Sequence, residues 1–120
     1  MKIQESAENY LEMICILSRR GSPVRSIDIA NELGVTKPSV SVAMKNLRAS
    51  GYIAVDDDGY ITLTGSGQTI AETMYERHIL LSDWLIALGV DRETAVNDAC
   101  RIEHDISDQS FAAIKRHIEG

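Results

Sequence analysis

The chain has 120 residues, 44% of them hydrophobic and 25% charged, with a formal net charge of −6 at pH 7. This length suits one compact domain or two small units, and the composition excludes a disordered chain and a membrane-spanning one. The N-terminus lacks a signal-peptide pattern and the two cysteines are too few for a disulfide framework, so we expect a cytoplasmic protein with reduced thiols. The acidic charge allows nucleic-acid binding only where positive charge is concentrated locally.

The first predicted helix has Ser6 as its N-cap and ends before the turn at residues 21–23. Its apolar residues recur at the helical period, which indicates one buried face. Asn9 and Glu12 are i, i+3 neighbours near the N-terminal end, where their polar groups can point at a ligand.

Residues 24–48 carry the pattern of a helix-turn-helix. Ser26 is the expected cap of the first helix, Gly34 allows the turn, and Thr36 caps the second helix. Ala30 is small where the helices cross, and Val40 falls in their shared core. This spacing predicts a DNA-binding motif; the alternative is a helical hairpin with a polar outer face.

The second helix of this motif is the expected DNA-reading element. No carboxylate occurs from residue 36 to residue 50, so positive charge is local in an acidic chain. We expect Val42, Met44 and Leu47 to pack inward. The side chains suited to phosphate and base contacts are Thr36, Lys37, Ser39, Ser41, Lys45 and Arg48.

Residues 51–55 and 60–63 are rich in β-formers and flank an Asp-Asp-Asp-Gly turn at 56–59, which predicts a hairpin, the wing of a winged helix. Phosphate repels the three aspartates, so we expect the tip to stay off the DNA backbone. The spacing does not match a calcium-binding loop, and a solvated turn is the simpler interpretation.

Residues 64–88 predict a long helix, followed by a helix beginning at Asp91 and a last helix capped by Ser107 or Asp108. More than one face of the long helix is apolar, and the last helix has an apolar edge. These faces offer more apolar surface than one small domain covers, which predicts a homodimer. The expected dimerisation residues are Leu80, Trp84, Ile86, Phe111, Ile114 and Ile118.

Cys100, Glu103 and His104 stand at i, i+3 and i+4, so a helix would present a thiol, a carboxylate and an imidazole on one face. This donor set suits a late first-row divalent metal. A complete shell needs further donors, for which His78, Glu12 and Asn9 are the candidates. The alternative is a helix in which Cys100 packs inward while Glu103 and His104 face solvent.

The motifs at residues 6–12, 24–48, 77–81 and 99–108 together resemble the DtxR/MntR family of metal-dependent bacterial repressors over nearly the whole chain. The resemblance implies a mainly α-helical fold with a small β-hairpin. A winged helix-turn-helix at 1–64 is followed by an α-helical metal-binding and dimerisation domain at 65–120. It also implies a dimer that binds a palindromic double-stranded DNA operator when Fe(II) or Mn(II) is bound, and other divalent transition metals can substitute.

The resemblance assigns ligands position by position. Glu103 and His104 match ligands shared across the family, and His78 matches a histidine ligand of both branches. Cys100 matches the iron branch, whereas Glu12 matches the manganese branch. Asn9 stands where the manganese branch has aspartate and the iron branch methionine, and its amide oxygen can still ligate. Fe(II) is the expected effector, followed by Mn(II), because thiolate favours the later metals.

Two other functions remain open from the sequence. A small metal-dependent enzyme would use His78, Glu103 and His104 as metal ligands and keep one coordination position open. The sequence has no separate nucleophile or base motif. A metal-independent winged-helix regulator would use its C-terminal helices only for dimerisation or small-molecule sensing. No organic cofactor and no membrane partner is expected.

Overall fold

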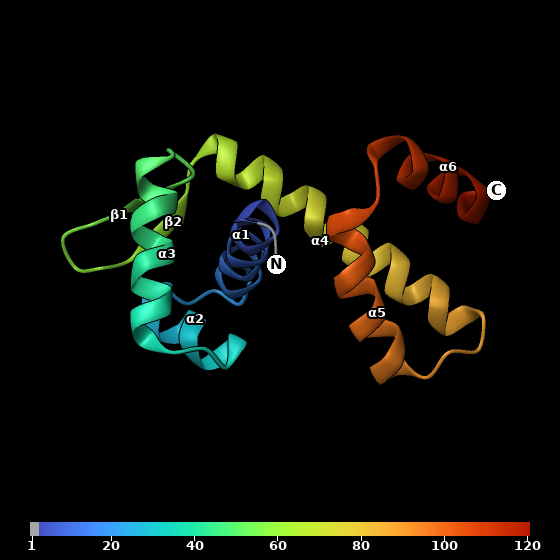
Figure 1. Cartoon of the computed structure of the whole chain (residues 1–120), viewed down its shortest axis with the longest axis horizontal. Helices are drawn as coiled ribbons and strands as arrows, with labels where there is room; N and C mark the ends of the chain where they lie inside the picture. Colours follow the sequence, from blue (N-terminus) through green and yellow to red (C-terminus); the bar gives the residue numbers. More distant parts are fainter. Residues whose placement is uncertain (1–2) are drawn as a thin grey trace. The chain divides into compact units, whose positions relative to one another are not determined.

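The computed structural model describes residues 3–120, which form six α-helices and a two-stranded antiparallel hairpin. The predicted fold class is therefore confirmed. None of the described helices is both long and apolar enough to cross a membrane. In chain order the elements are α1 (Ile3–Arg19), α2 (Ser26–Leu33), α3 (Lys37–Ala49), β1 (Ile53–Val55), β2 (Ile61–Leu63), α4 (Gly65–Ala87), α5 (Arg92–Asp105) and α6 (Asp108–Glu119) (Figure 1).

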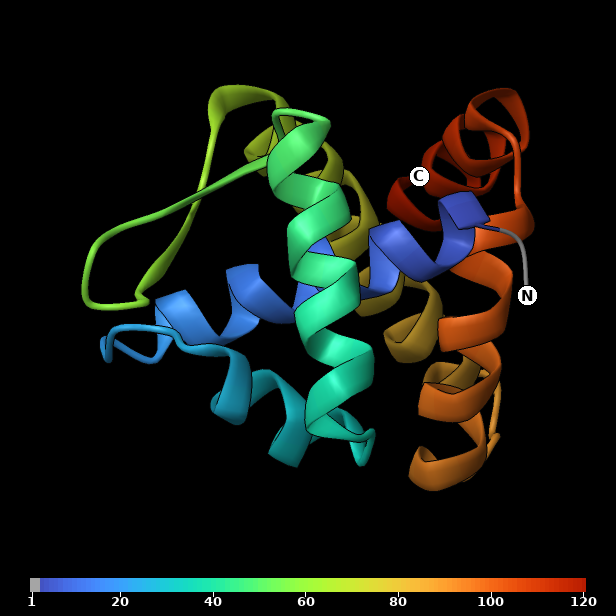
Figure 2. The same ribbon diagram turned by 60° about the vertical axis from the view of Figure 1, so that its left-hand side comes forward.

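The chain divides into two compact units, Met1–Glu72 and Thr73–Gly120, with the boundary inside α4. The predicted division after residue 64 falls just before α4 and stays a prediction. The first unit contains the helix-turn-helix, in which α3 packs against α2 and α1 (Figure 2). Gly34 ends α2 with a φ of 67° and donates its N–H to the Ala30 carbonyl. Ala30 and Val40 lie in the core of this unit, as predicted.

Two of the predicted helix caps are confirmed and two are wrong. Thr36 and Ser107 each accept a backbone N–H in the first turn of their helices. Asp91, predicted as the start of its helix, is the N-cap of α5 and accepts the Thr94 N–H. Ser6 lies inside α1, because residues 3–5 contain no glycine or proline to stop the helix before it. Ser26 is already helical, and Arg25 is the N-cap. The Arg25 N–H donates to the Asp28 carboxylate at 2.9 Å, so Asp28 supplies the cap from within the helix.

The hairpin pairs Ile53 with Leu63 and Val55 with Ile61, and Ile53 and Ile61 point into the core of the first unit. In the turn, Asp56 Oδ1 accepts the backbone N–H groups of Asp58 and Tyr60, each at 2.9 Å. Asp56 is thus used in shaping the turn, which leaves the other two aspartates exposed at the tip.

The base of the hairpin is held against the first turn of α4, within the first unit. Thr64 donates its N–H to the Tyr52 carbonyl at 3.0 Å and its hydroxyl to the Gly51 carbonyl at 2.7 Å. A Cβ at Gly67 would lie 2.0 Å from the Tyr52 carbonyl oxygen. Only glycine therefore allows this close approach of α4 to the hairpin.

The second unit consists of the rest of α4 with α5 and α6 (Figure 1). Its core contains Leu81, Ala99 and Phe111, one residue from each helix, with Leu80 and Trp84 packed against them. This packing sets α5 beside α4, so side chains of the two helices can converge on one site.

Candidate metal centre and nucleic-acid interface

The three candidate metal ligands on α5 differ in exposure. Glu103 is completely buried, the His104 side chain is 1% exposed, and Cys100 is exposed. The alternative in which Cys100 packs inward and the other two face solvent is therefore wrong. Burying a carboxylate costs free energy unless a positive charge or hydrogen-bond donors compensate for it, so the environment of Glu103 needs an explanation.

His78, on α4, meets two of these α5 residues. Its Nδ1 lies 3.1 Å from Oε2 of Glu103 and 3.8 Å from Sγ of Cys100. All three donor atoms lie within 4.8 Å of one another. The fold thus brings the His78 nitrogen to the sulfur of Cys100, 22 residues further along the sequence, and to an oxygen of Glu103, 25 residues further along.

These donors fit a transition-metal ion. Two ligand atoms bonded to one ion at roughly 2.0–2.3 Å lie no more than about 4.6 Å apart, and the contacts of His78 at 3.1 and 3.8 Å satisfy this limit. Imidazole and thiolate favour the later divalent first-row metals over Mg(II) or Ca(II). The cluster can hold such an ion with little rearrangement.

The second oxygen of Glu103 faces another histidine. Oε1 lies 3.4 Å from Nε2 of His104, and it is buried without a hydrogen-bond partner among the described residues. The two oxygens of one buried carboxylate therefore face two different imidazoles. A carboxylate in this position can ligate one ion through Oε2 and another through Oε1.

The same neighbours make His78 strongly basic. Hydrogen bonds to the Cys100 thiol and the Glu103 carboxylate raise the pKa of His78 from 6.5 to about 10, against the opposing effect of burial. At neutral pH the imidazole is therefore protonated when no metal is bound, and its proton provides part of the charge that balances Glu103.

This raised pKa predicts a pH dependence of stability in the metal-free protein. The stabilisation from protonated His78 is fully present below about pH 6.5, the pKa of the unfolded state, and is lost as the pH rises through about 10. Urea unfolding in the presence of a chelator should show wild type losing free energy of unfolding relative to His78→Gln as the pH rises from 7 to 10. The exposed His117 offers the control, His117→Gln. Parallel curves for wild type and His78→Gln would contradict this assignment.

Asn9 and Glu12 lie on α1 in the first unit, three residues apart on one helix face. Glu12 is buried and Asn9 is half-buried. Their predicted role as ligands stays a prediction.

The side chains predicted to contact DNA are exposed on the outer face of α3 and at its N-terminus. Thr36 and Ser39 also hydrogen-bond to each other, with 2.8 Å between their hydroxyl oxygens. Met44 and Leu47 pack inward as predicted, but Val42 is 61% exposed, so its predicted packing is wrong. Helix α3 has Val40, Met44 and Leu47 on its buried stripe, and Val42 lies off that stripe.

The predicted dimerisation residues lie on α4 and α6. An open groove of about 610 Å³ in the second unit includes Leu80, Trp84 and Ile118 in its lining. Phe111 is only 8% exposed and belongs to the core of the unit. Ile118 is 37% exposed, so the apolar edge of α6 is open to solvent at its C-terminal end within one chain.

The sequence interpretation gave no role to Arg77, although it precedes His78 directly. Its guanidinium is buried and hydrogen-bonds to the end of α5. No local sequence signal points to this role, because the carbonyls that it binds lie 26 and 29 residues away.

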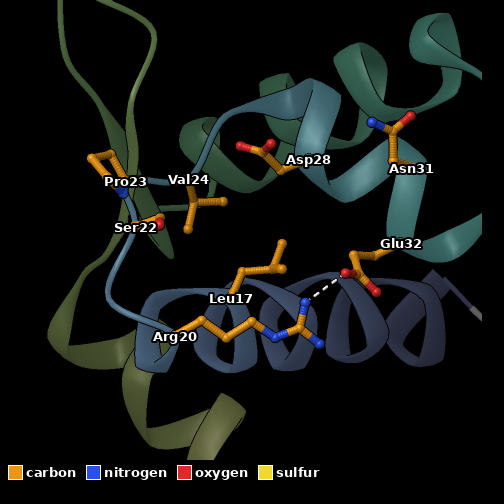
Figure 3. Close-up of a pocket in the computed structure, with 8 residues that line it drawn as sticks. All are labelled: Leu17, Arg20, Ser22, Pro23, Val24, Asp28, Asn31 and Glu32. Carbon is orange, nitrogen blue, oxygen red and sulfur yellow. Dashed lines mark hydrogen bonds and ion pairs between the residues drawn. The ribbon is translucent and has the colours of Figure 1, made fainter.

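Another pocket, of about 310 Å³, lies in the first unit between α1, α2 and the segment that joins them (Figure 3). Arg20 and Glu32 both line this pocket and form an ion pair with each other. In the described part of the chain, none of the residues that line this pocket belongs to a cluster of side chains that could bind a metal ion. It offers no donor set comparable with that of His78, Cys100 and Glu103.

Comparison with known proteins covers both units. Residues 2–61 match the family described as iron dependent repressor, N-terminal DNA binding domain, and residues 64–119 match iron dependent repressor, metal binding and dimerisation domain. The transcriptional regulator MntR of Escherichia coli O6:H1 is 33% identical over 112 residues, 93% of this chain and 72% of the relative. The HTH-type transcriptional regulator MntR of Bacillus subtilis strain 168 is 34% identical over 109 residues, 91% of this chain and 77% of the relative.

Two solved structures agree with these matches. The manganese regulator SloR is 27% identical with a TM-score of 0.84, and a manganese-dependent transcriptional repressor in complex with manganese is 28% identical with a TM-score of 0.82. Each match covers 94% of this chain but only 53% and 52% of the solved chains, so this chain spans about half their length. The family and these relatives are transcriptional regulators, which excludes the enzyme alternative. The chain belongs to the iron-dependent repressor family of metal-responsive, DNA-binding transcriptional regulators.

Proposed function

We propose that this protein is a metal-activated repressor that binds a palindromic operator as a homodimer in the cytoplasm and controls iron or manganese homeostasis. The observation that carries the proposal is the cluster of His78, Cys100 and Glu103, whose donor atoms lie within 4.8 Å of one another in a chain with a winged helix-turn-helix. A metal-independent regulator would have no need of a buried carboxylate facing an imidazole and a thiol.

We propose further that His104, Glu12 and Asn9 complete the ligand set, as the family resemblance implies. Fe(II) or Mn(II) is the proposed effector, because the relatives include manganese-dependent repressors and a thiolate ligand shifts preference towards Fe(II) and later metals. The ion supplies positive charge to the buried carboxylate. If metal binding raises DNA affinity, DNA binding must raise metal affinity by the same factor.

Operator binding across a metal series tests this function. Duplexes are first selected from a random-sequence library with the Mn(II)-loaded protein. Affinity is then measured by fluorescence anisotropy with Fe(II) under anaerobic conditions, Mn(II), Co(II), Zn(II), Mg(II) or a chelator, together with the bound-metal stoichiometry. We expect tight binding to inverted repeats with the transition metals only. Equal affinity in chelator would establish the metal-independent regulator instead.

The positive face of α3 predicts a specific salt dependence. Replacing Lys37, Lys45 or Arg48 by alanine should weaken binding to every selected duplex and reduce the slope of log K against log salt by about one unit per lost phosphate contact. The exposed Arg116 on α6 provides the control, Arg116→Ala. Wild-type affinity and slope in all three α3 variants would refute this interface.

Substitutions at the tip of the hairpin should have the opposite effect on DNA affinity in the same assay. Asp57 and Asp58 are exposed, so neutralising them as Asp57→Asn and Asp58→Asn removes repulsion from phosphate. Binding should be unchanged or tighter, with the largest gain at low salt.

Val42, exposed on the same outer surface of α3, offers an apolar contact of the kind that thymine methyl groups accept.

A further inference from the structure

The guanidinium of Arg77 lies in the second unit, where it joins α4 to the end of α5 and the beginning of α6. Arg77 is 6% exposed. Its Nη1 donates to the carbonyls of Glu103 at 3.0 Å and Ile106 at 2.9 Å, and its Nη2 pairs with the carboxylate of Asp108. The guanidinium carbon also lies 5.5 Å from the centre of the Phe111 ring.

These contacts stabilise the C-terminal end of α5 and the N-terminal end of α6. Helix α5 ends at Asp105, so the Glu103 carbonyl is among the last four, which have no partner within the helix. A positive charge is favourable at a helix C-terminus, and Asp108 is favourable in the first turn of α6. A lysine ammonium cannot replace this arrangement, because one nitrogen cannot reproduce the planar fork that bonds two carbonyls and a carboxylate at once.

Burying this charge is nevertheless expensive. Arg77 Nε is buried without a hydrogen-bond partner in the described part of the chain, and buried ion pairs in general add little to stability compared with well-packed apolar residues. Its position indicates another role. Arg77 and His78 are adjacent on α4: Arg77 holds the backbone carbonyl of Glu103, while His78 contacts the carboxylate of that same residue.

We propose that Arg77 is a positioning residue for the metal centre. By holding the Glu103 backbone against α4, it fixes the Glu103 carboxylate at the distance from His78 and Cys100 that a bound ion requires. The proposal rests on the metal-binding function proposed above. Groups that orient metal ligands in this way typically contribute 10- to 100-fold to metal affinity.

Titration of the full chain with Co(II) tests this role. The thiolate-to-cobalt charge-transfer band reports ligation by Cys100, and the visible bands report the coordination geometry. We expect Arg77→Lys to weaken Co(II) binding by about 10- to 100-fold and to change both sets of bands. Circular dichroism of the metal-free variant shows whether the helices remain formed.

A milder variant keeps the test decisive if Arg77→Lys does not fold. Asp108→Ala releases one side of the guanidinium at an exposed position, and we expect it to weaken Co(II) binding several-fold. Glu93→Ala is its matched control, since Glu93 is likewise an acidic residue in the first turn of its helix. It should bind Co(II) as wild type does.

The outcomes separate the two proposals. Failure of the wild-type chain to bind Co(II) would overturn both the metal function and the role of Arg77. Wild-type binding together with unchanged affinity and spectra in folded Arg77→Lys, or in Asp108→Ala where Arg77→Lys does not fold, would overturn only the positioning role and leave Arg77 a structural residue.

Discussion

Replacing Glu103 by glutamine is expected to weaken metal binding by at least about 100-fold and to abolish metal-dependent DNA binding, while the metal-free protein still folds. Loss of a group that only orients a ligand costs about 10- to 100-fold, and Glu103 is itself the buried anion that faces both histidines. Glutamine keeps the volume of the side chain but removes its charge, so the core of the second unit remains filled. Metal affinity by Co(II) titration and DNA affinity by anisotropy provide the measurements.

His78→Ala should cause the same loss of metal binding and of metal-dependent DNA binding, because His78 provides the α4 ligand of the cluster. The matched controls are Glu93→Gln and His117→Ala, which change exposed residues of the same types on α5 and α6. Both controls should retain wild-type metal and DNA affinity. The metal centre would have to lie elsewhere if Glu103→Gln and His78→Ala still bound operator with the wild-type metal dependence.

Gly67→Ala is expected to destabilise the protein by about 1–3 kcal/mol, the usual cost of overpacking. In an exposed helix the same change would be stabilising by roughly 1 kcal/mol. Here the new methyl would lie 2.0 Å from the Tyr52 carbonyl oxygen. The backbone at Tyr52 and Gly67 cannot move apart without a cost in free energy, because the Tyr52 carbonyl already accepts the Thr64 N–H at the hairpin base.

Gly65 supplies an unusually close control for this prediction. It lies two residues earlier in the first turn of α4, and a Cβ at Gly65 would meet no atom within 4 Å. Gly65→Ala should therefore be neutral or stabilising by up to about 1 kcal/mol. Urea unfolding followed by circular dichroism distinguishes the two. Equal stability of both variants would show that the hairpin base accommodates the methyl.

Much of the fold could be predicted because its signals are local. Gly34 between two short amphipathic stretches specifies the helix-turn-helix, and Thr36 specifies where α3 begins. The hairpin follows from the Asp-Gly turn at residues 58–59. Periodicity also placed Cys100, Glu103 and His104 on one helix, since their spacing is a property of the helix itself.

The burial of those residues could not be predicted in the same way. Hydrophobicity alone would bury Cys100 and expose Glu103, whereas the structure does the opposite because the imidazole of His78 compensates the carboxylate. Arg77 was missed for the same reason: its partners are carbonyls and a carboxylate 26 to 31 residues away. Contacts across helices depend on tertiary packing, which no local pattern encodes.

The course of α4 has a genetic consequence. The helix runs through the unit boundary, and Ala71, which is completely buried, belongs to the core of the first unit. A nonsense mutation just after the hairpin, at residue 65, would remove Gly67 and Ala71 and leave that core open. Such a truncation should behave as a simple null allele. A stop codon a few residues beyond Glu72 would keep the core of the first unit but remove His78, Cys100 and Glu103, so any fragment that persisted would lack the metal-sensing half of the protein.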